Sequence, residues 1–164
     1  MGNIRQMDSG VGDRIPPHQG FYYPRYDELP EGLLFLDGMV DLMNLVHADL
    51  SERSRHHKVV TRSIVSNYVK AGLTPPAIGK RYDRDHMALI LFAVTVKLLC
   101  RTEDVMDLAA AMFPQGQVPQ AHDRFAAAVN AEFAAPTTPS PDDDLYVLVA
   151  RAFSATMRAL TMLG

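Results

Sequence analysis

Residues 61–82 read TRSIVSNYVKAGLTPPAIGKRY, and this stretch contains a complete short helix between two stop signals. Thr61 is a favourable N-cap, because its hydroxyl can accept a hydrogen bond from an unpaired backbone amide in the first turn. Gly72 can adopt the left-handed conformation that ends a helix, and the proline pair at 75–76 prevents the helix from resuming. The stretch therefore predicts a helix over residues 61–71.

The side of this helix that is expected to face solvent carries hydrogen-bond donors and no acid. Its members are Arg62, Ser63, Ser66, Asn67 and Lys70. In a DNA major groove, Arg, Asn and Ser can read base edges and Lys can contact phosphate. An ordinary solvated polar face is the alternative, but the basic turn that follows the prolines, residues 79–82 with Lys80 and Arg81, favours a binding surface.

The charges of the chain are unevenly distributed. The formal net charge is −3, but residues 51–101 hold ten Lys or Arg against three acids, which leaves +7 there and −10 in the remainder. A basic segment within an acidic chain is typical of an electropositive patch. This segment contains the predicted helix and the basic turn, so the same surface is predicted to meet a polyanion.

Apolar residues recur at helical spacing over most of the remaining chain. They predict a long amphipathic helix over residues 30–50. Asp83 caps a helix over residues 84–101 that is apolar nearly all round, so this helix is predicted to be the most buried element. Further helices are expected over residues 102–113, 120–134 and 140–163. Because only residues 21–23 and 77–82 have extended character, the sequence predicts an all-α fold with at most one small hairpin.

The expected organisation has three parts. Residues 1–28 form a flexible arm followed by an aromatic strap, which contains Phe21, Tyr22, Tyr23 and Tyr26. Such a cluster usually packs over the domain's own core, and an arm exchanged between subunits is the alternative. Residues 29–113 form the helical domain, and residues 114–164 add C-terminal helices that complete the core or form a dimer.

The order of these parts resembles the DNA-binding domain of MerR-type regulators. In that family a recognition helix ends in a Gly-Leu-Leu-Pro-Pro-like segment, and a basic wing leads into a helix with an acidic cap. The matching residues are Tyr68, Gly72, Leu73, Pro75, Pro76, Arg81 and Tyr82. The departures are Ser63 and Ser66 where MerR-type helices usually carry arginine, Asn67 where they carry tyrosine, and a shorter wing.

A closer resemblance is to a bacterial family called domain of unknown function 1836. Its members share a segment similar to SNYVKAGLTPP, then a basic K-x-Y, and a helix that opens with D/S-R-x-H, which here reads Asp83-Arg84-Asp85-His86. The likeness covers roughly residues 29–113. It implies an all-α fold in which a MerR-like helix-turn-helix with a short wing is followed by additional C-terminal helices, and it implies no particular activity.

Several functional classes lack support in the sequence. There is no Gly-rich phosphate loop, no G-x-S-x-G, no H-E-x-x-H and no cysteine cluster, so we expect neither an enzyme nor a bound cofactor. His56 and His57 have no Cys, Asp or Glu partner at ligand spacing, so we expect no metal. Cys100 is the single cysteine, which suits a reducing, cytoplasmic location. The longest apolar run, residues 87–96, is too short to cross a bilayer, so we expect no membrane contact.

Two hypotheses from different classes follow. The first is a cytoplasmic DNA-binding transcriptional regulator, in which helix 61–71 enters the major groove of duplex DNA. Arg62, Ser63, Ser66 and Asn67 would face bases or phosphates, and Lys70, Lys80, Arg81 and Arg84 would contact the backbone. Because operators are usually read by dimers, the C-terminal helices would form a homodimer. No residue pattern identifies a small-molecule effector.

The second hypothesis is a protein-interaction module that keeps a MerR-like fold without binding DNA. The serines at 63 and 66, the short wing and the acidic remainder of the chain favour it. The two hypotheses differ in one observable feature. Basic side chains that are paired with Asp83, Asp85 or Glu103 would favour the module, whereas a continuous basic surface would favour DNA.

Overall fold

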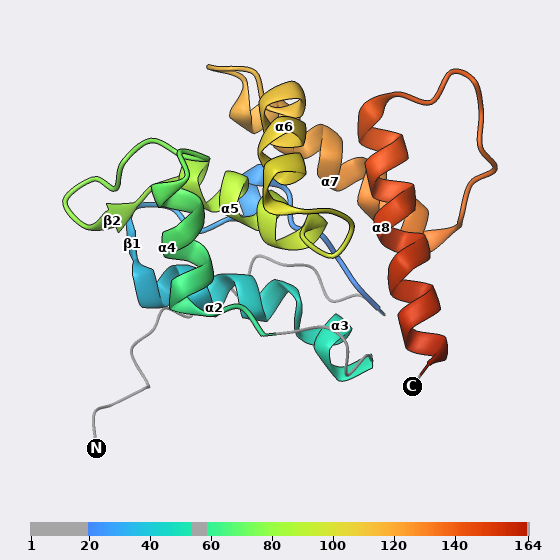
Figure 1. The fold of residues 1–164 in the computed structure, drawn as a ribbon, viewed down its shortest axis with the longest axis horizontal. Coiled ribbons are helices and arrows are strands. Elements are labelled where there is room, and N and C mark those ends of the chain that lie inside the picture. Colours follow the sequence, from blue (N-terminus) through green and yellow to red (C-terminus); the bar gives the residue numbers. More distant parts are fainter. Residues whose placement is uncertain (1–19, 54–58, 164) are drawn as a thin grey trace.

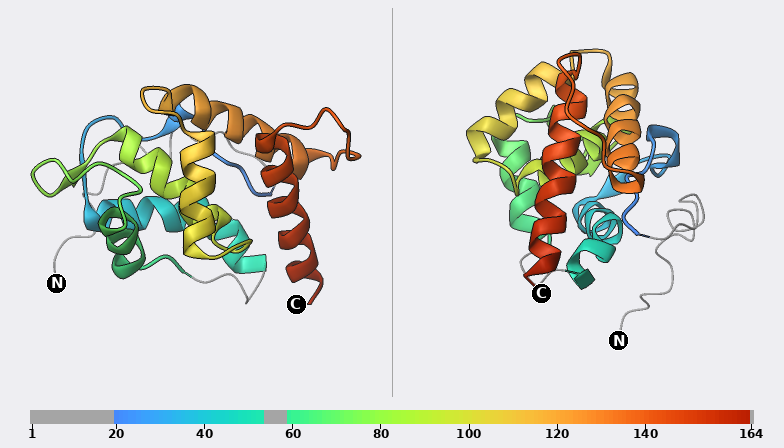
Figure 2. Two further views of the ribbon diagram at one scale, coloured as in Figure 1. Left: turned by 45° about the horizontal axis from the view of Figure 1, so that its top comes forward. Right: turned by 90° about the vertical axis from the view of Figure 1, so that its right-hand side faces the viewer.

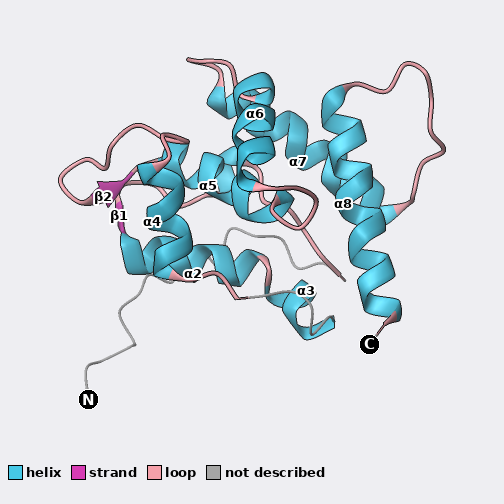
Figure 3. Ribbon diagram, viewed as in Figure 1, coloured by secondary structure: helices cyan, strands magenta, loops and turns pink. Residues whose placement is uncertain are grey.

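The computed structural model describes residues 20–53 and 59–163 of the chain. Within them the backbone forms seven α-helices, one 3₁₀ turn and one two-stranded sheet (Figures 1 and 3). In chain order the elements are η2 (Tyr26–Glu28), β1 (Leu34–Phe35), α2 (Leu36–Val46), α3 (Ala48–Arg53), α4 (Arg62–Lys70), β2 (Arg81–Tyr82), α5 (Arg84–Val96), α6 (Thr102–Met112), α7 (Val118–Ala134) and α8 (Leu145–Met162). The predicted mainly helical fold is confirmed.

Helix α5 forms the centre of the molecule. Eleven of its thirteen residues are buried, and α2, α4, α6, α7 and α8 all pack against it (Figure 1). Phe92 is fully buried, with its ring centroid 4.9 Å from that of Phe113 and 5.0 Å from that of Phe125. The prediction that this helix is the most buried element is confirmed, because its apolar residues cover every face and need neighbours on all of them.

The predicted end of this central helix was wrong. The helix ends at Val96 rather than near Arg101, and a turn follows in which the Leu99 amide donates to the Val96 carbonyl at 2.9 Å. Three β-branched residues, 94–96, precede the end, and such residues lower helix propensity. The Thr95 hydroxyl also donates to the Leu91 carbonyl at 2.7 Å, which competes with the helical hydrogen-bond ladder.

The long helix predicted over residues 30–50 was also wrong in its extent. Leu34 and Phe35 form strand β1, which pairs antiparallel with β2 so that Leu34 faces Tyr82 and Phe35 faces Arg81. The helical spacing of leucines continues through this segment, but pairing with a distant strand satisfies backbone groups that the first turn of a helix leaves unpaired. Helix α2 then ends at Val46, and a separate short helix, α3, follows it. The histidines at 56 and 57 lie outside the described residues.

The two C-terminal helices pack side by side and share the core of the helices before them (Figure 2). Helix α7 begins at Val118, slightly before the predicted start. Helix α8 begins later than predicted, at Leu145, because Asp144 is the residue that caps it and accepts a hydrogen bond from the Val147 amide at 3.0 Å. Helix α6 starts at Thr102 itself, with Arg101 at the N-cap.

The aromatic strap lies against α7. Phe21 and Tyr23 are buried in the core. The Asn130 side chain holds the strap at two points, because its Oδ1 accepts from the Tyr23 amide at 2.8 Å and its Nδ2 donates to the Tyr23 carbonyl at 2.9 Å. His122 Nε2 is 2.9 Å from the Pro24 carbonyl oxygen. The strap therefore packs over the chain's own core, while residues 1–19 of the expected arm lie outside the described residues.

Candidate nucleic-acid interface

Helix α4 has the ends that its sequence predicts. The Thr61 hydroxyl accepts a hydrogen bond from the Ile64 amide at 3.4 Å. At the other end the amides of Gly72 and Leu73 donate to the carbonyls of Val69 and Tyr68, each at 3.1 Å, and Gly72 has a φ of 86°. This is the Schellman motif, in which a left-handed glycine lets the chain turn back so that the following amides donate to the last carbonyls of the helix. The predicted helix and both of its caps are confirmed.

The predicted contact residues share the solvent side of α4. Val65 and Tyr68 are buried beneath the helix, against α2 and α5. The exposed positions are Arg62, Ser63, Asn67 and Lys70, and Ser66 is half-buried. The structure therefore brings all five residues to one helix face, and that face carries no acid.

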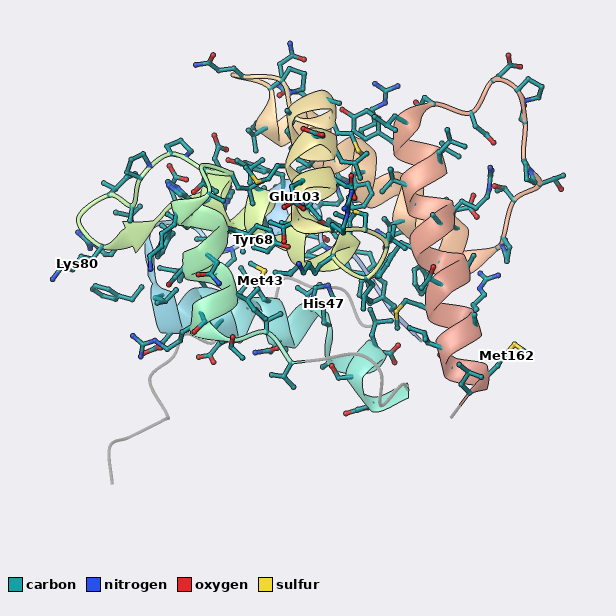
Figure 4. The ribbon with its side chains drawn as sticks, viewed as in Figure 1. Met43, His47, Tyr68, Lys80, Glu103 and Met162 are labelled. Carbon is teal, nitrogen blue, oxygen red and sulfur yellow. The ribbon has the colours of Figure 1, made fainter. Side chains whose placement is uncertain are left out.

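The basic turn is a tight two-residue reversal. Ile78 and Arg81 exchange both backbone hydrogen bonds, at 2.7 and 3.1 Å, and the central residues Gly79 and Lys80 have φ values of 57° and 65°. Positive φ at both central positions defines a type I′ turn, whose twist matches that of paired strands. For a residue with a side chain such as Lys80, this conformation costs roughly 1 kcal/mol. The turn places Lys80 at the tip, and its side chain points away from the body of the molecule (Figure 4).

The small sheet has an inner and an outer side. Tyr82, opposite Leu34, is buried, whereas Phe35, opposite Arg81, is 63% exposed. The Arg81 guanidinium lies 5.8 Å from the Phe35 ring centroid, within the range of a cation–π contact. Ile78 is bridged to Arg81 from the other side and is 50% exposed. The outer row of the sheet thus consists of one cation, Arg81, between two apolar side chains, Phe35 and Ile78.

Sequence reasoning missed Phe35 and Ile78 as surface residues of the candidate site. Phe35 lies inside the helix predicted over residues 30–50, and no role was assigned to it there. No local signal predicts that Phe35 lies in a strand, because its partner strand β2 follows only after α2, α3 and α4 in the chain. The extended character of residues 77–82 was the only available indication of a strand.

His86 fixes the connection between α4 and the basic turn. Its Nε2 lies 2.9 Å from the Pro75 carbonyl oxygen and 3.2 Å from that of Pro76, and its Nδ1 lies 2.7 Å from Asp83 Oδ1. Burial by itself would raise the pKa of Asp83, but the hydrogen bonds from the His86 amide and ring outweigh it and hold this pKa below its usual value. His86 is almost completely buried, so its role is to position the proline segment.

Two of the predicted contact residues are engaged by the protein itself. Arg84 has a side chain that is only 23% exposed, and its Nε donates to the Pro30 carbonyl at 3.3 Å. Its guanidinium also lies 5.5 Å from the Tyr26 ring centroid and 3.8 Å from Glu31. Arg62 forms an ion pair with Asp37 of α2 at 3.2 Å, but both side chains are about two-thirds exposed. Arg84 is therefore a structural residue, whereas Arg62 is held only by an exposed pair.

The remaining cations of this surface are not neutralised by the neighbouring acids. Among the described residues, no ion pair involves Lys70, Lys80 or Arg81. Asp83 is occupied by His86, and Asp85 accepts a hydrogen bond from the Tyr26 hydroxyl at 2.5 Å. Among the described residues, Lys70 on α4 and both cations of the basic turn thus have no carboxylate partner, whereas Arg62 is paired with Asp37.

Within residues 20–53 and 59–163, no group of three or more His, Cys, Asp or Glu side chains could hold a metal ion. Cys100 is half-buried in the turn after α5, where burial raises the pKa of its thiol. No helix in the same part of the chain has the length and apolar character needed to cross a membrane.

The fold and this surface define a mainly α-helical protein in which a small sheet supports a basic turn beside one short polar helix. The family described as domain of unknown function (DUF1836) matches residues 24–125, and the chain belongs to this family. The matched region begins in the aromatic strap, includes α4 and the basic turn, and ends within α7. No curated protein and no solved structure matches the chain.

Proposed function

We propose that this protein is a cytoplasmic DNA-binding regulator whose α4 and basic turn contact duplex DNA. One observation carries the proposal: the acid-free polar side of α4 lies beside a turn whose cations, Lys80 and Arg81, have no ion-pair partner among the described residues. Clustered cations without internal partners are typical of surfaces that bind phosphate backbones.

The dimensions of α4 suit a major groove. An α-helix with its side chains is roughly 10–12 Å across, and the major groove of B-DNA is about 12 Å wide, so α4 fits it in cross-section. Inserted by its exposed side, the helix would present Arg62, Ser63, Ser66 and Asn67 to base edges or adjacent phosphates. Lys70 at its end would contact the backbone, as would Lys80 and Arg81 of the turn.

The arrangement refines the set of contact residues in two ways. We leave out Arg84, because its guanidinium is mostly buried against Tyr26 and Pro30. We keep Arg62, because an exposed ion pair contributes at most about 1 kcal/mol and phosphate can replace Asp37 as its partner.

The direct test is fluorescence anisotropy with duplex DNA, first a random pool and then a sequence selected from it. We expect Asn67→Ala to cost about 1–3 kcal/mol on the selected sequence and much less on random DNA, because a side chain that reads a base edge discriminates between sequences. An equal loss on both would mean that α4 does not read bases. No binding of the wild type even at low salt would reject the proposal.

The second candidate, a protein-interaction module, is favoured by the outer row of the sheet. Phe35 and Ile78 are 63% and 50% exposed, and apolar side chains around an arginine are common in protein interfaces. The Arg62–Asp37 pair also lowers the net positive charge beside α4. Under this alternative, Phe35→Ser would leave any weak DNA binding unchanged. If the basic turn contacts DNA, the same variant would weaken DNA binding.

A further inference from the structure

Helix α8 is apolar on two sides, and only one of them is used by the fold. Its inward side is buried against α7 and α5 through Val149, Ala150, Phe153, Ser154 and Met157. On its outward side, apolar residues recur at alternating spacings of three and four and are all exposed: Leu145, Leu148, Ala152, Ala155, Ala159 and Met162. We call these six residues the outward stripe.

The outward side of α8 also lacks the charges that a solvent-facing helix normally carries. Its exposed positions include one charged residue, Arg158, whose guanidinium donates to the Glu132 carbonyl at 2.7 Å. By comparison, exposed positions carry two acids in α2 and two in α6: Asp37, Asp41, Glu103 and Asp107. A surface helix usually has a polar outer face, so the stripe indicates a surface that is covered in solution.

The exposed fractions show that this apolar surface is substantial. Leu148 is 49% exposed and Met162 is 87% exposed. The view from the α8 side shows the helix running along the front of the molecule for its whole length, with no other element over it (Figure 2). From Leu145 to Met162 the stripe is roughly 26 Å long at 1.5 Å per residue.

We propose that the outward stripe pairs with the α8 helix of a second copy of this chain in an antiparallel two-helix contact. Alternating spacings of three and four are those of the a and d positions of a heptad, the seam through which two helices pack against each other. A second copy supplies a helix with the same repeat and the same length. The small residues at 152, 155 and 159 let two helix axes approach closely.

The order of large and small residues favours the antiparallel direction. In that arrangement a positions face d positions, so Leu148 lies opposite the partner's Ala159 and Leu145 lies opposite the partner's Met162. Large side chains then fill the space beside small ones, and large pairs close both ends. In a parallel pair all three alanine layers would contain only alanine facing alanine, whereas the antiparallel pair has two such layers, in which Ala152 faces the partner's Ala155, and places a leucine beside each Ala159. Antiparallel helices also align their dipoles favourably.

This contact does not depend on the proposed DNA function and is compatible with it. Lys80 at the tip of the basic turn and Met162 on α8 lie at opposite ends of the molecule (Figure 4). A dimer formed through α8 would therefore leave α4 and the basic turn of both copies free, facing outward from the assembly.

Sedimentation equilibrium of the full chain over a range of concentrations tests the contact. We expect a dimer for the wild type and a monomer for the variant Leu148→Glu/Ala155→Glu, with an unchanged circular dichroism spectrum. Ala131→Glu, at an exposed small residue of the adjacent helix α7, is the matched control and should remain a dimer. A wild type that stays monomeric at high micromolar concentration would overturn the proposal, and so would a double variant that stays dimeric.

A second measurement addresses direction and does not depend on a destabilising charge. In a Cys100→Ser background, a Leu145→Cys protein is mixed with a Met162→Cys protein and oxidised. The antiparallel contact predicts a disulfide between the two different proteins and little cross-linking of either alone. Cross-linking of Leu145→Cys with itself would overturn the antiparallel direction.

Deleting residues 1–19 is a third test. If this deletion converts a monomeric wild type into a dimer, the chain's own arm covers the outward stripe and the proposal fails.

Discussion

The salt dependence of DNA binding is the quantity that the candidate interface predicts most directly. Three cations of the surface, Lys70, Lys80 and Arg81, have no ion-pair partner among the described residues, and Arg62 is held only by an exposed pair. Each phosphate neutralised by such a cation releases condensed counterions, which contributes about −0.9 to the slope of log K against log salt. Four contacts thus predict a slope of about −3.6 for each protomer.

Replacing both cations of the basic turn should change this slope by a defined amount. The variant Lys80→Ala/Arg81→Ala loses two contacts, so its slope should become shallower by about 1.8 for each protomer. Because both residues act through charge, affinity should fall by a similar factor on selected and random DNA. Anisotropy titrations at four or more salt concentrations measure both quantities.

The matched control is Lys97→Ala/Arg101→Ala. It removes the same charge from the same basic segment but at the opposite end of α5, where Lys97 donates to Thr102 and Arg101 pairs with Asp104. We expect its slope to match that of the wild type. If both double variants change the slope equally, the DNA responds to overall charge and not to this surface, and the assignment of the interface is refuted.

Three further predictions concern single residues. Asp37→Ala removes the ion-pair partner of Arg62 and one acid beside α4. DNA binding should therefore strengthen by about 0.5–1 kcal/mol in anisotropy titrations, with Asp41→Ala as the control for charge alone. An effect no larger than that of Asp41→Ala would show that Arg62 does not contact DNA. Phe92→Ala should lower the free energy of unfolding by about 3–5 kcal/mol in urea, because the ring is fully buried, and a loss under about 1 kcal/mol would contradict that burial. Burial lowers the pKa of His122 to about 4 from its usual 6.5, so the folded state binds fewer protons than the unfolded state. Stability should therefore fall as the pH drops from 6.5 to 4, by up to about 3 kcal/mol, and His122→Gln should flatten this part of the pH profile of urea unfolding; an unaltered profile would assign the loss to other groups.

The elements that the sequence by itself determined are those whose stabilising contacts are local. Thr61 caps α4 through an amide three residues away, and Gly72 closes its end through hydrogen bonds within the same turn. Helix α5 could be assigned because its residues are apolar in every direction, which requires burial whatever the neighbours are. Such interactions depend on residues close in the chain, so propensity and spacing are sufficient to predict them.

Tertiary structure decided the features that join distant segments. Leu34 and Phe35 lie within the helix predicted over residues 30–50, yet they form a strand because Arg81 and Tyr82 supply an edge to pair with. Arg84 carried the same charge in the sequence as Lys80, but the strap and Pro30 engage its guanidinium while the turn leaves Lys80 exposed. Spacing alone also could not show which apolar side of α8 faces the core. In each case the outcome depends on which groups the folded chain brings within contact distance, and local sequence does not contain that information.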